Sequence, residues 1–136
     1  MKIALISCAS KKLNYKEKAE NLYISNLFRL NLLYAKSLAD KIFVLSAKYG
    51  LLDIKTEIEP YDETLNNMSD KQVKEWSNKV LEDLRRKTNL EKDSFIFLAG
   101  EKYRKYLIQH IIKYEIPLKG LGIGKQLKYL KDKTSK

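Results

Sequence analysis

Three short, uninterrupted apolar runs constrain the fold of this chain more than any other feature. They are KIALIS at residues 2–7, KIFVLS at 41–46 and SFIFLAG at 94–100. Strands that are covered on both faces have this continuous pattern, whereas strands with one solvent-exposed face alternate apolar and polar residues. The runs therefore predict a small sheet buried between two outer layers.

The longer segments between these runs have helical periodicity. Apolar residues recur at three- and four-residue spacing over 20–39 and again over 103–114. Ser69 followed by Gln72 is a capping box, which predicts that a helix starts there. A last short helix is expected to begin near Gly124. Strands that alternate with helices join through right-handed crossovers, so the sheet is predicted to be mainly parallel.

The length of 136 residues suits one domain, and we interpret residues 1–136 as a single three-layer α/β domain. Residues 54–58 and 116–118 are the candidates for a fourth strand. The apolar run at the N-terminus is too short for a signal peptide, and no segment approaches the length of a membrane span. We therefore expect a cytoplasmic protein that does not enter a membrane.

The composition favours an anionic partner. The formal net charge is +10, which indicates nucleic acid or a nucleotide as the partner, although part of the excess lies in the lysine-rich stretch 125–136. One cysteine and one histidine provide neither an intrachain disulfide nor a cluster of metal ligands. No motif in the chain indicates a cofactor.

Each apolar run ends in small, polar or glycine residues, at 7–12, 46–50 and 99–104. Ligands of open parallel sheets bind outside the carboxyl ends of the strands, so these residues are predicted to share one ligand site. The predicted ligand-binding residues are Ser7, Cys8, Lys11, Ser46, Lys48, Tyr49, Gly50, Gly100, Tyr103 and Arg104. Lys11, Lys48 and Arg104 would bind phosphate. A buried cysteine at a strand end is more often a small apolar residue than a nucleophile, so Cys8 is expected to line the site.

Pro60 fixes the loop that presents Tyr61 and Asp62, and these two are the predicted catalytic residues. Asp62 would orient a water molecule as a general base, and Tyr61 or Tyr49 would stack on a base. The alternative for Asp62 is a turn-forming role, which is common for aspartate.

Glycines at 120, 122 and 124 precede Lys125 at the start of the last predicted helix. Gly124 and Lys125 are therefore predicted to place a backbone N–H and an ammonium group on a phosphate. The alternative is a tight turn. The spacing does not match a P-loop or the dinucleotide-binding fingerprint.

Several segments together resemble the small YaaA-like domain of bacteria, archaea and phages. They are LISCASKK, LYISNLFRLNLLYAK, VLSAKYGLL, EPYDETL, FLAGEKYRKYL and PLKGLGIGKQLKYL, and they cover nearly the whole chain. The resemblance implies a uracil-DNA-glycosylase-like fold and a role in DNA or base modification. A related CS-x-x-K motif occurs in archaeosine-forming enzymes, and this chain has Ser7-Cys8-Ala9-Ser10-Lys11. The water-activating and histidine-containing motifs of the glycosylases have no counterpart here.

Two main functional hypotheses follow. The first is a glycosylase-like hydrolase that processes a nucleotide or a nucleic-acid base, acting on an N-glycosidic bond or a modified base, with Asp62 acting on water or on the developing positive charge. The second is a non-catalytic module that binds nucleic acid or a nucleotide through the same cations. A sensor of a small nucleotide is a third reading of the same residues.

Overall fold

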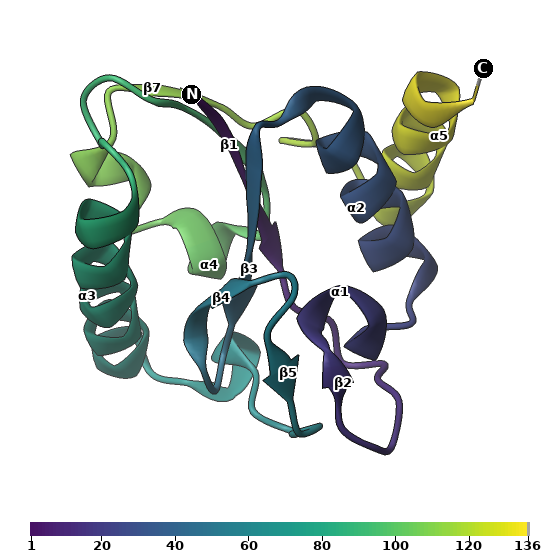
Figure 1. Cartoon of the computed structure of the whole chain (residues 1–136), viewed down its shortest axis with the longest axis horizontal. Helices are drawn as coiled ribbons and strands as arrows, with labels where there is room; N and C mark the ends of the chain where they lie inside the picture. The colour runs from purple at the N-terminus through teal and green to yellow at the C-terminus, as the bar shows by residue number, and fades with distance from the viewer. Residues whose placement is uncertain (136) are drawn as a thin grey trace.

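The computed structural model describes residues 1–135, and its centre is a five-stranded sheet (Figure 1). The strand order is β4-β3-β1-β6-β7. The bounds are β1 Lys2–Ser7, β3 Lys41–Ser46, β4 Gly50–Asp53, β6 Ser94–Leu98 and β7 Lys113–Glu115. All neighbours pair in parallel except β3 and β4. The prediction of a small, mainly parallel sheet is confirmed.

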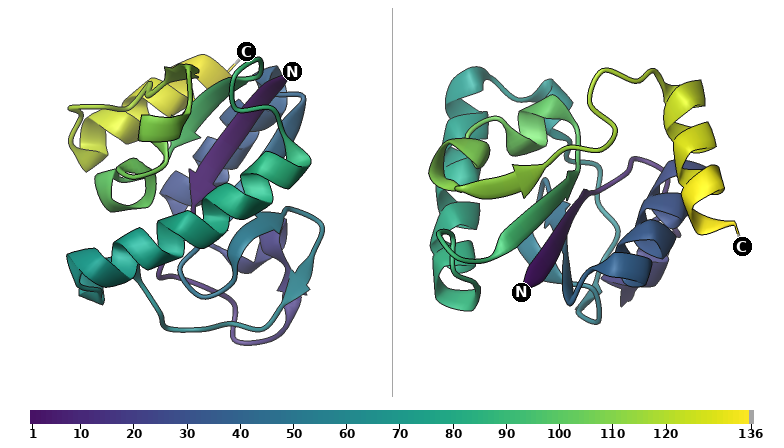
Figure 2. Two further views of the ribbon diagram at one scale, coloured as in Figure 1. Left: turned by 90° about the vertical axis from the view of Figure 1, so that its left-hand side faces the viewer. Right: turned by 90° about the horizontal axis from the view of Figure 1, so that it is seen from above.

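The three apolar runs form the three central strands. Ile3 of β1 lies between Lys41 of β3 and Phe95 of β6, and the residues from Ile3 to Ile6 are completely buried. Two helices, α2 (Asn26–Leu38) and α5 (Ile123–Thr134), lie on one side of the sheet, while α3 (Asp70–Lys87) lies on the other (Figures 1 and 2). This is the predicted three-layer α/β arrangement, and it explains why the central strands lack polar positions.

Local capping signals set the helix starts. The Ser69 hydroxyl accepts a hydrogen bond from the Gln72 backbone and the Gln72 side chain accepts one from the Ser69 N–H, so the predicted capping box is present at α3. The helix predicted over 20–39 is divided. Its first part is the short α1 (Ala19–Leu22), and α2 begins only after Ser25, whose hydroxyl caps Phe28 N at 3.2 Å.

The helix predicted over 103–114 is wrong beyond Arg104. The chain forms the short α4 (Glu101–Arg104), then a 3₁₀ turn at Ile108–His110, and then β7. Pairing of β7 with β6 adds ladder hydrogen bonds that a helix could not make, so the tertiary contact overrides the helical spacing. The candidate strand at 116–118 therefore lies just beyond the observed strand β7.

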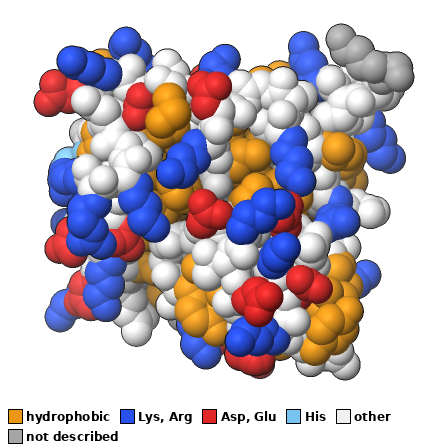
Figure 3. All heavy atoms as spheres, in the orientation of Figure 1, with side chains coloured by type: hydrophobic (Ala, Val, Ile, Leu, Met, Phe, Trp, Pro, Cys, Tyr) orange, Lys and Arg blue, Asp and Glu red, His pale blue; other side chains and the backbone are white. Residues whose placement is uncertain are grey.

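A second, two-stranded sheet joins β2 (Glu17–Lys18) to β5 (Glu57–Ile58), beneath the main sheet in Figure 1. The candidate strand at 54–58 therefore exists in part, but outside the main sheet. Charged side chains of both signs are spread over the face shown in Figure 3. Within residues 1–135, no helix combines the length and the apolar character that crossing a membrane requires.

Candidate functional site

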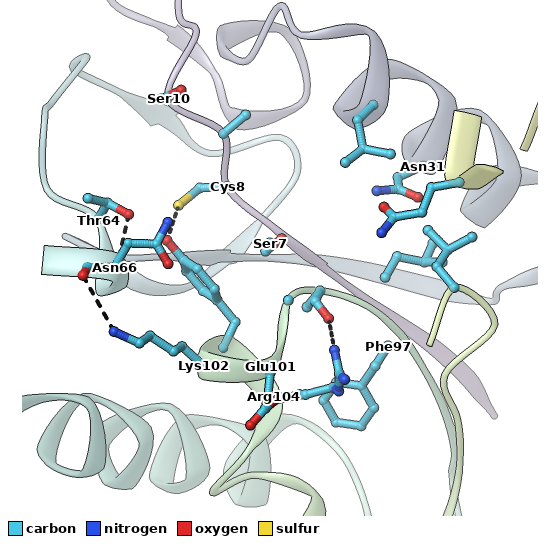
Figure 4. A pocket seen from close by; sticks show the side chains of 18 of the residues that line it. Ser7, Cys8, Ser10, Asn31, Thr64, Asn66, Phe97, Glu101, Lys102 and Arg104 are labelled. Atoms are coloured by element: carbon cyan, nitrogen blue, oxygen red, sulfur yellow. Dashed lines mark hydrogen bonds between the residues drawn. The ribbon is translucent and has the colours of Figure 1, made fainter. Parts of the chain in front are cut away.

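A cavity of about 680 Å³ opens at the carboxyl ends of β1 and β6 (Figure 4). The loop after β1, the loop before α3, the start of α4 and the helices α2 and α5 all contribute to its wall. Six of the predicted site residues line it: Ser7, Cys8, Asp62, Gly100, Tyr103 and Arg104. The structure therefore brings the predicted residues at the ends of β1 and β6 together around one cavity.

Cys8 lies at the carboxyl end of the central strand, beside a buried phenol. Its backbone N–H donates to the Leu45 carbonyl at 3.0 Å, and its Sγ lies 3.5 Å from the Tyr103 hydroxyl. That hydroxyl also accepts from the Leu65 N–H at 3.4 Å. Burial raises the pKa of Tyr103 to about 12, so the phenol is neutral at physiological pH. Cys8 and Tyr103 thus present a thiol and a neutral hydroxyl side by side.

The cations from α4 also hydrogen-bond to the cavity wall. Arg104 Nη1 donates to the Ala99 carbonyl at 2.6 Å, and Lys102 Nζ donates to the Asn66 carbonyl at 3.4 Å (Figure 4). The charged lining residues are three cations, Lys12, Lys102 and Arg104, and three carboxylates, Asp62, Glu63 and Glu101. The cavity is therefore mixed in charge, and the positive excess of the chain lies elsewhere.

The lysine of the first loop that reaches the cavity is Lys12, not Lys11. Lys12 Nζ lies 4.5 Å from the centre of the Tyr61 ring, a cation–π distance. Burial lowers the pKa of Lys12, while Cys8, Asp62 and Glu63 act in the opposite direction. Lys11 is exposed and does not line the cavity. The sequence places two lysines next to each other, and only the loop geometry decides which one turns inward.

The end of β3 does not reach the cavity. Ser46 is fully buried, and its hydroxyl donates to the Tyr61 hydroxyl at 2.8 Å and accepts from the Tyr49 N–H at 2.9 Å. The Trp76 indole donates to the Ser46 carbonyl at 2.8 Å. The chain then turns at Gly50, whose φ is +75°, and returns as β4. The prediction that Ser46 and Gly50 bind a ligand is not supported, because both serve the turn.

Tyr61, one of the two predicted catalytic residues, belongs to the same closed network. Its hydroxyl lies 2.5 Å from that of Tyr23 and accepts from Ser46, and its ring packs edge-on against Tyr49. Burial raises the pKa of Tyr61 well above its ordinary value. Tyr61 is not among the residues that line the cavity, so it is not placed to stack on a base there.

The remaining predicted residues lie on the surface. Lys48 and Tyr49 are exposed in the β3–β4 turn, where the Tyr49 hydroxyl donates to the Glu59 carbonyl at 3.3 Å. Gly124 and Lys125 are exposed in the first turn of α5, and it is the next residue, Gln126, that lines the cavity.

Asn31 lines the cavity but is not among the site residues predicted from the sequence. It lies on α2 among apolar residues, where its side chain interrupts the buried stripe (Figure 4). A polar residue inside an apolar stripe is the signal that could have identified it, because buried amides normally have a structural or binding partner.

The fold and the cavity define a three-layer α/β protein with a mixed-charge cavity at the carboxyl edge of a mainly parallel sheet. The chain belongs to DUF6884, a family of unknown function, whose profile matches residues 3–132. Comparisons with curated proteins and with solved structures gave no match.

Proposed function

We propose that this protein processes a nucleotide or a nucleic-acid base and that the ligand binds in the cavity at the ends of β1 and β6. The observation that carries the proposal is the cavity itself. Its volume of about 680 Å³ lies within the range of small-ligand sites. Its wall combines aromatic rings, side-chain amides and charges of both signs, which suit a flat polar base joined to a sugar and a phosphate.

The proposed reaction is hydrolysis of an N-glycosidic bond. Asp62 is exposed and lines the cavity, so its carboxylate can accept a proton from a water molecule that attacks the sugar C1′. The bond from C1′ to the base nitrogen breaks, and its electron pair leaves with the base, which takes up a proton. The negative charge of Asp62 also favours the positive charge that develops on the sugar.

A thermal-shift screen tests the binding step. The panel contains nucleobases, nucleosides, nucleotides and short single- and double-stranded oligonucleotides, at low and high salt. A ligand at about 100 times its dissociation constant stabilises the fold by about 2.7 kcal/mol. We expect a salt-tolerant shift with at least one monomer. Absence of any shift across the panel would refute the proposal.

Two glycines provide a matched pair of variants that place the ligand. Gly100 and Gly122 both precede a helix, with φ of −63° and −70°, and a Cβ at either meets no atom within 4 Å. Gly100 lines the cavity and Gly122 does not. Gly100→Phe is therefore expected to fill the cavity and abolish the ligand shift, whereas Gly122→Phe retains it. Equal shifts in both variants would place the ligand elsewhere.

One observation favours the second function, a non-catalytic nucleic-acid-binding module. The cavity charges balance, and α5 carries Lys125, Lys128, Lys131 and Lys133 outside the cavity. Such a surface would bind the phosphates of a polymer, with a log–log salt slope of about one unit per contact. A shift that appears only with oligonucleotides and disappears at high salt would favour this function over the first.

The resemblance to the YaaA-like domain and its uracil-DNA-glycosylase-like fold is part of the proposal. Support comes from the six motif segments, because all of them except VLSAKYGLL contribute residues to the cavity wall. An experimental structure that superimposes on a uracil-DNA glycosylase through the central sheet, with the same strand order, would establish this relationship. A different order of the central strands would exclude it.

A further inference from the structure

The buried face of α2 contains one polar residue. Its buried positions are Phe28, Asn31, Leu32 and Ala35, and this face packs against the central strand β1. The other three are apolar, as expected for a helix that covers a sheet. Asn31 is only 4% exposed, so its amide has almost no access to solvent.

The side-chain oxygen of Asn31 lacks a structural partner. Its Oδ1 is buried and accepts no hydrogen bond from any residue in 1–135. A buried acceptor that loses water without gaining a donor destabilises a fold, and native structures contain few of them. Because Asn31 lines the cavity, a ligand can supply the missing donor once the amide rotates its oxygen towards the cavity.

The charged residues that line the cavity all come from one set of elements, and another set contributes uncharged residues only. The residues that α2, α5 and the segment before α5 contribute are all uncharged: Leu27, Asn31, Ile116, Leu118 and Gln126. Every charged lining residue comes from the loop after β1, the loop before α3 or the start of α4. In Figure 4, Asn31 lies on the α2 side, across the end of β1 from Cys8 and Thr64.

We infer that Asn31 is the specificity residue of this cavity and reads the hydrogen-bonding edge of a nucleobase held in the uncharged part. The inference rests on the proposed function. A side-chain amide offers an acceptor and a donor side by side, and each nucleobase has an edge with the complementary pair. Leu27, Ile116 and Leu118 supply apolar surface for the flat base.

This placement also orients the ligand. With the base beside Asn31, the sugar extends across the end of β1 towards Cys8 and Asp62, and a phosphate lies near Lys102 and Arg104. The C1′ atom of the sugar then falls on the side of the cavity that carries the carboxylates. The same orientation serves binding without catalysis, because it depends only on the separation of charged and uncharged walls.

The test compares two buried polar side chains that lack a partner. Besides Asn31 Oδ1, the Ser77 hydroxyl on α3 is buried without a partner among residues 1–135, and Ser77 does not line the cavity. Asn31→Leu and Ser77→Ala each remove such a group, so neither is expected to lower the unfolding temperature of the free protein. Asn31→Leu is expected to weaken binding of the nucleoside or nucleotide found in the screen by about 10-fold or more, and Ser77→Ala to leave it unchanged.

Edge-blocked nucleosides give a second measurement on the unmodified protein. The pair is chosen from the base that binds: uridine against 3-methyluridine, guanosine against 1-methylguanosine, or adenosine against purine riboside. We expect the blocked analogue to bind about 10-fold or more weakly to the wild type, and the two to bind equally to Asn31→Leu.

Each outcome separates the inference from the proposed function. Equal binding of both analogues to the wild type, or unchanged binding by Asn31→Leu, would overturn the role of Asn31 and leave the proposed function standing. A wild type that no nucleobase, nucleoside or nucleotide stabilises would overturn both. Loss of binding in Asn31→Leu with retention in Ser77→Ala supports the inference.

Discussion

The carboxyl ends of β1 and β3 are neighbours in the sheet, and both carry small polar residues, yet one is open to a cavity and the other is covered. After β1 the chain leaves the sheet, and Ser7 and Cys8 face a cavity. After β3 the chain turns back within four residues. Ser46 is buried there, and its hydroxyl makes hydrogen bonds to Tyr61 and Tyr49. A strand that continues into a crossover leaves its end open, whereas a hairpin covers it.

The same difference separates two adjacent residues of the loop after Pro60. Tyr61 points into the closed network at the end of β3, where its hydroxyl is fully engaged. Asp62 is exposed and lines the open cavity. One residue therefore serves the stability of the fold, and its neighbour is available for chemistry.

The largest effect is expected at the open end. Asp62→Asn keeps the shape of the side chain but removes the general base, so hydrolysis of a confirmed substrate should fall by about 100-fold or more. The free energy of unfolding should change by less than about 0.5 kcal/mol, because the side chain is exposed. Single-turnover assays with urea denaturation check both. Full activity in this variant would refute the proposed mechanism.

The next effect is expected at the closed end. Tyr61→Phe removes the hydroxyl that links Tyr23 and Ser46 and should destabilise the fold by about 1–3 kcal/mol. Urea denaturation measures the change. Tyr49→Phe is the control, because its exposed hydroxyl makes one long hydrogen bond, and it should cost less than about 0.5 kcal/mol. Equal costs for the two variants would contradict the closed network.

The turn that closes β3 depends on a left-handed residue. Gly50→Ala should cost about 1–2 kcal/mol because its φ is +75°, while the nearest atom to the new Cβ, at 3.9 Å, leaves enough space. Gly124→Ala, in the exposed first turn of α5, is expected to stabilise the protein by up to about 1 kcal/mol. Equilibrium unfolding of both gives effects of opposite sign, and a neutral Gly50→Ala would argue against this turn geometry.

Alkaline pH tests the burial of three phenols, two in the closed network and one in the cavity wall. Burial raises the pKa of Tyr23, Tyr61 and Tyr103 above the ordinary value of 10.0, so the folded state retains protons that the unfolded chain releases. Stability is therefore complete below pH 10 and falls as pH rises further, by up to about 1.4 kcal/mol per pH unit for each phenol.

Tyr61→Phe should make this alkaline loss shallower, as measured by urea denaturation across a pH series. Tyr15→Phe is the control, because Tyr15 is 57% exposed and its replacement should leave the slope unchanged. An unchanged slope in Tyr61→Phe would contradict the burial of this phenol.

The smallest effect is expected from Lys48, and it sharpens the comparison of the two ends. Lys48→Ala should change stability by less than about 0.5 kcal/mol and leave ligand binding intact, because the residue is exposed and outside the cavity. Lys12→Ala, by contrast, should weaken binding of an anionic ligand. Isothermal titration of both variants would reject the assignment of the two ends if Lys48→Ala had the larger effect on affinity.

Much of the fold was predictable because its signals are local. The apolar runs of β1, β3 and β6 and the capping box at Ser69 each lie within a few consecutive residues, so these patterns can be recognised from the sequence alone. The hairpin at Gly50 and strand β7 were not predicted. Both depend on pairing with strands already in place, which can override helical spacing.

The candidate site was predictable only in part. The rule for strand ends found Cys8, Gly100 and Arg104, but it also selected Ser46 and Lys48, and it missed Lys12 and Asn31. Residue type and spacing cannot tell whether a strand end is open or covered by a hairpin. Nor can they tell which of two adjacent lysines turns inward, since a small change in backbone direction decides it.

The sequence by itself determined that this chain forms a buried, mainly parallel sheet between helices, because burial on both faces requires continuous apolar strands. Only the tertiary structure decided where that sheet is open to a ligand. The reason is that a cavity consists of the space left between elements from distant parts of the chain. Asn31 of α2 and Gln126 of α5 meet the ends of β1 and β6 only after all four elements have packed together.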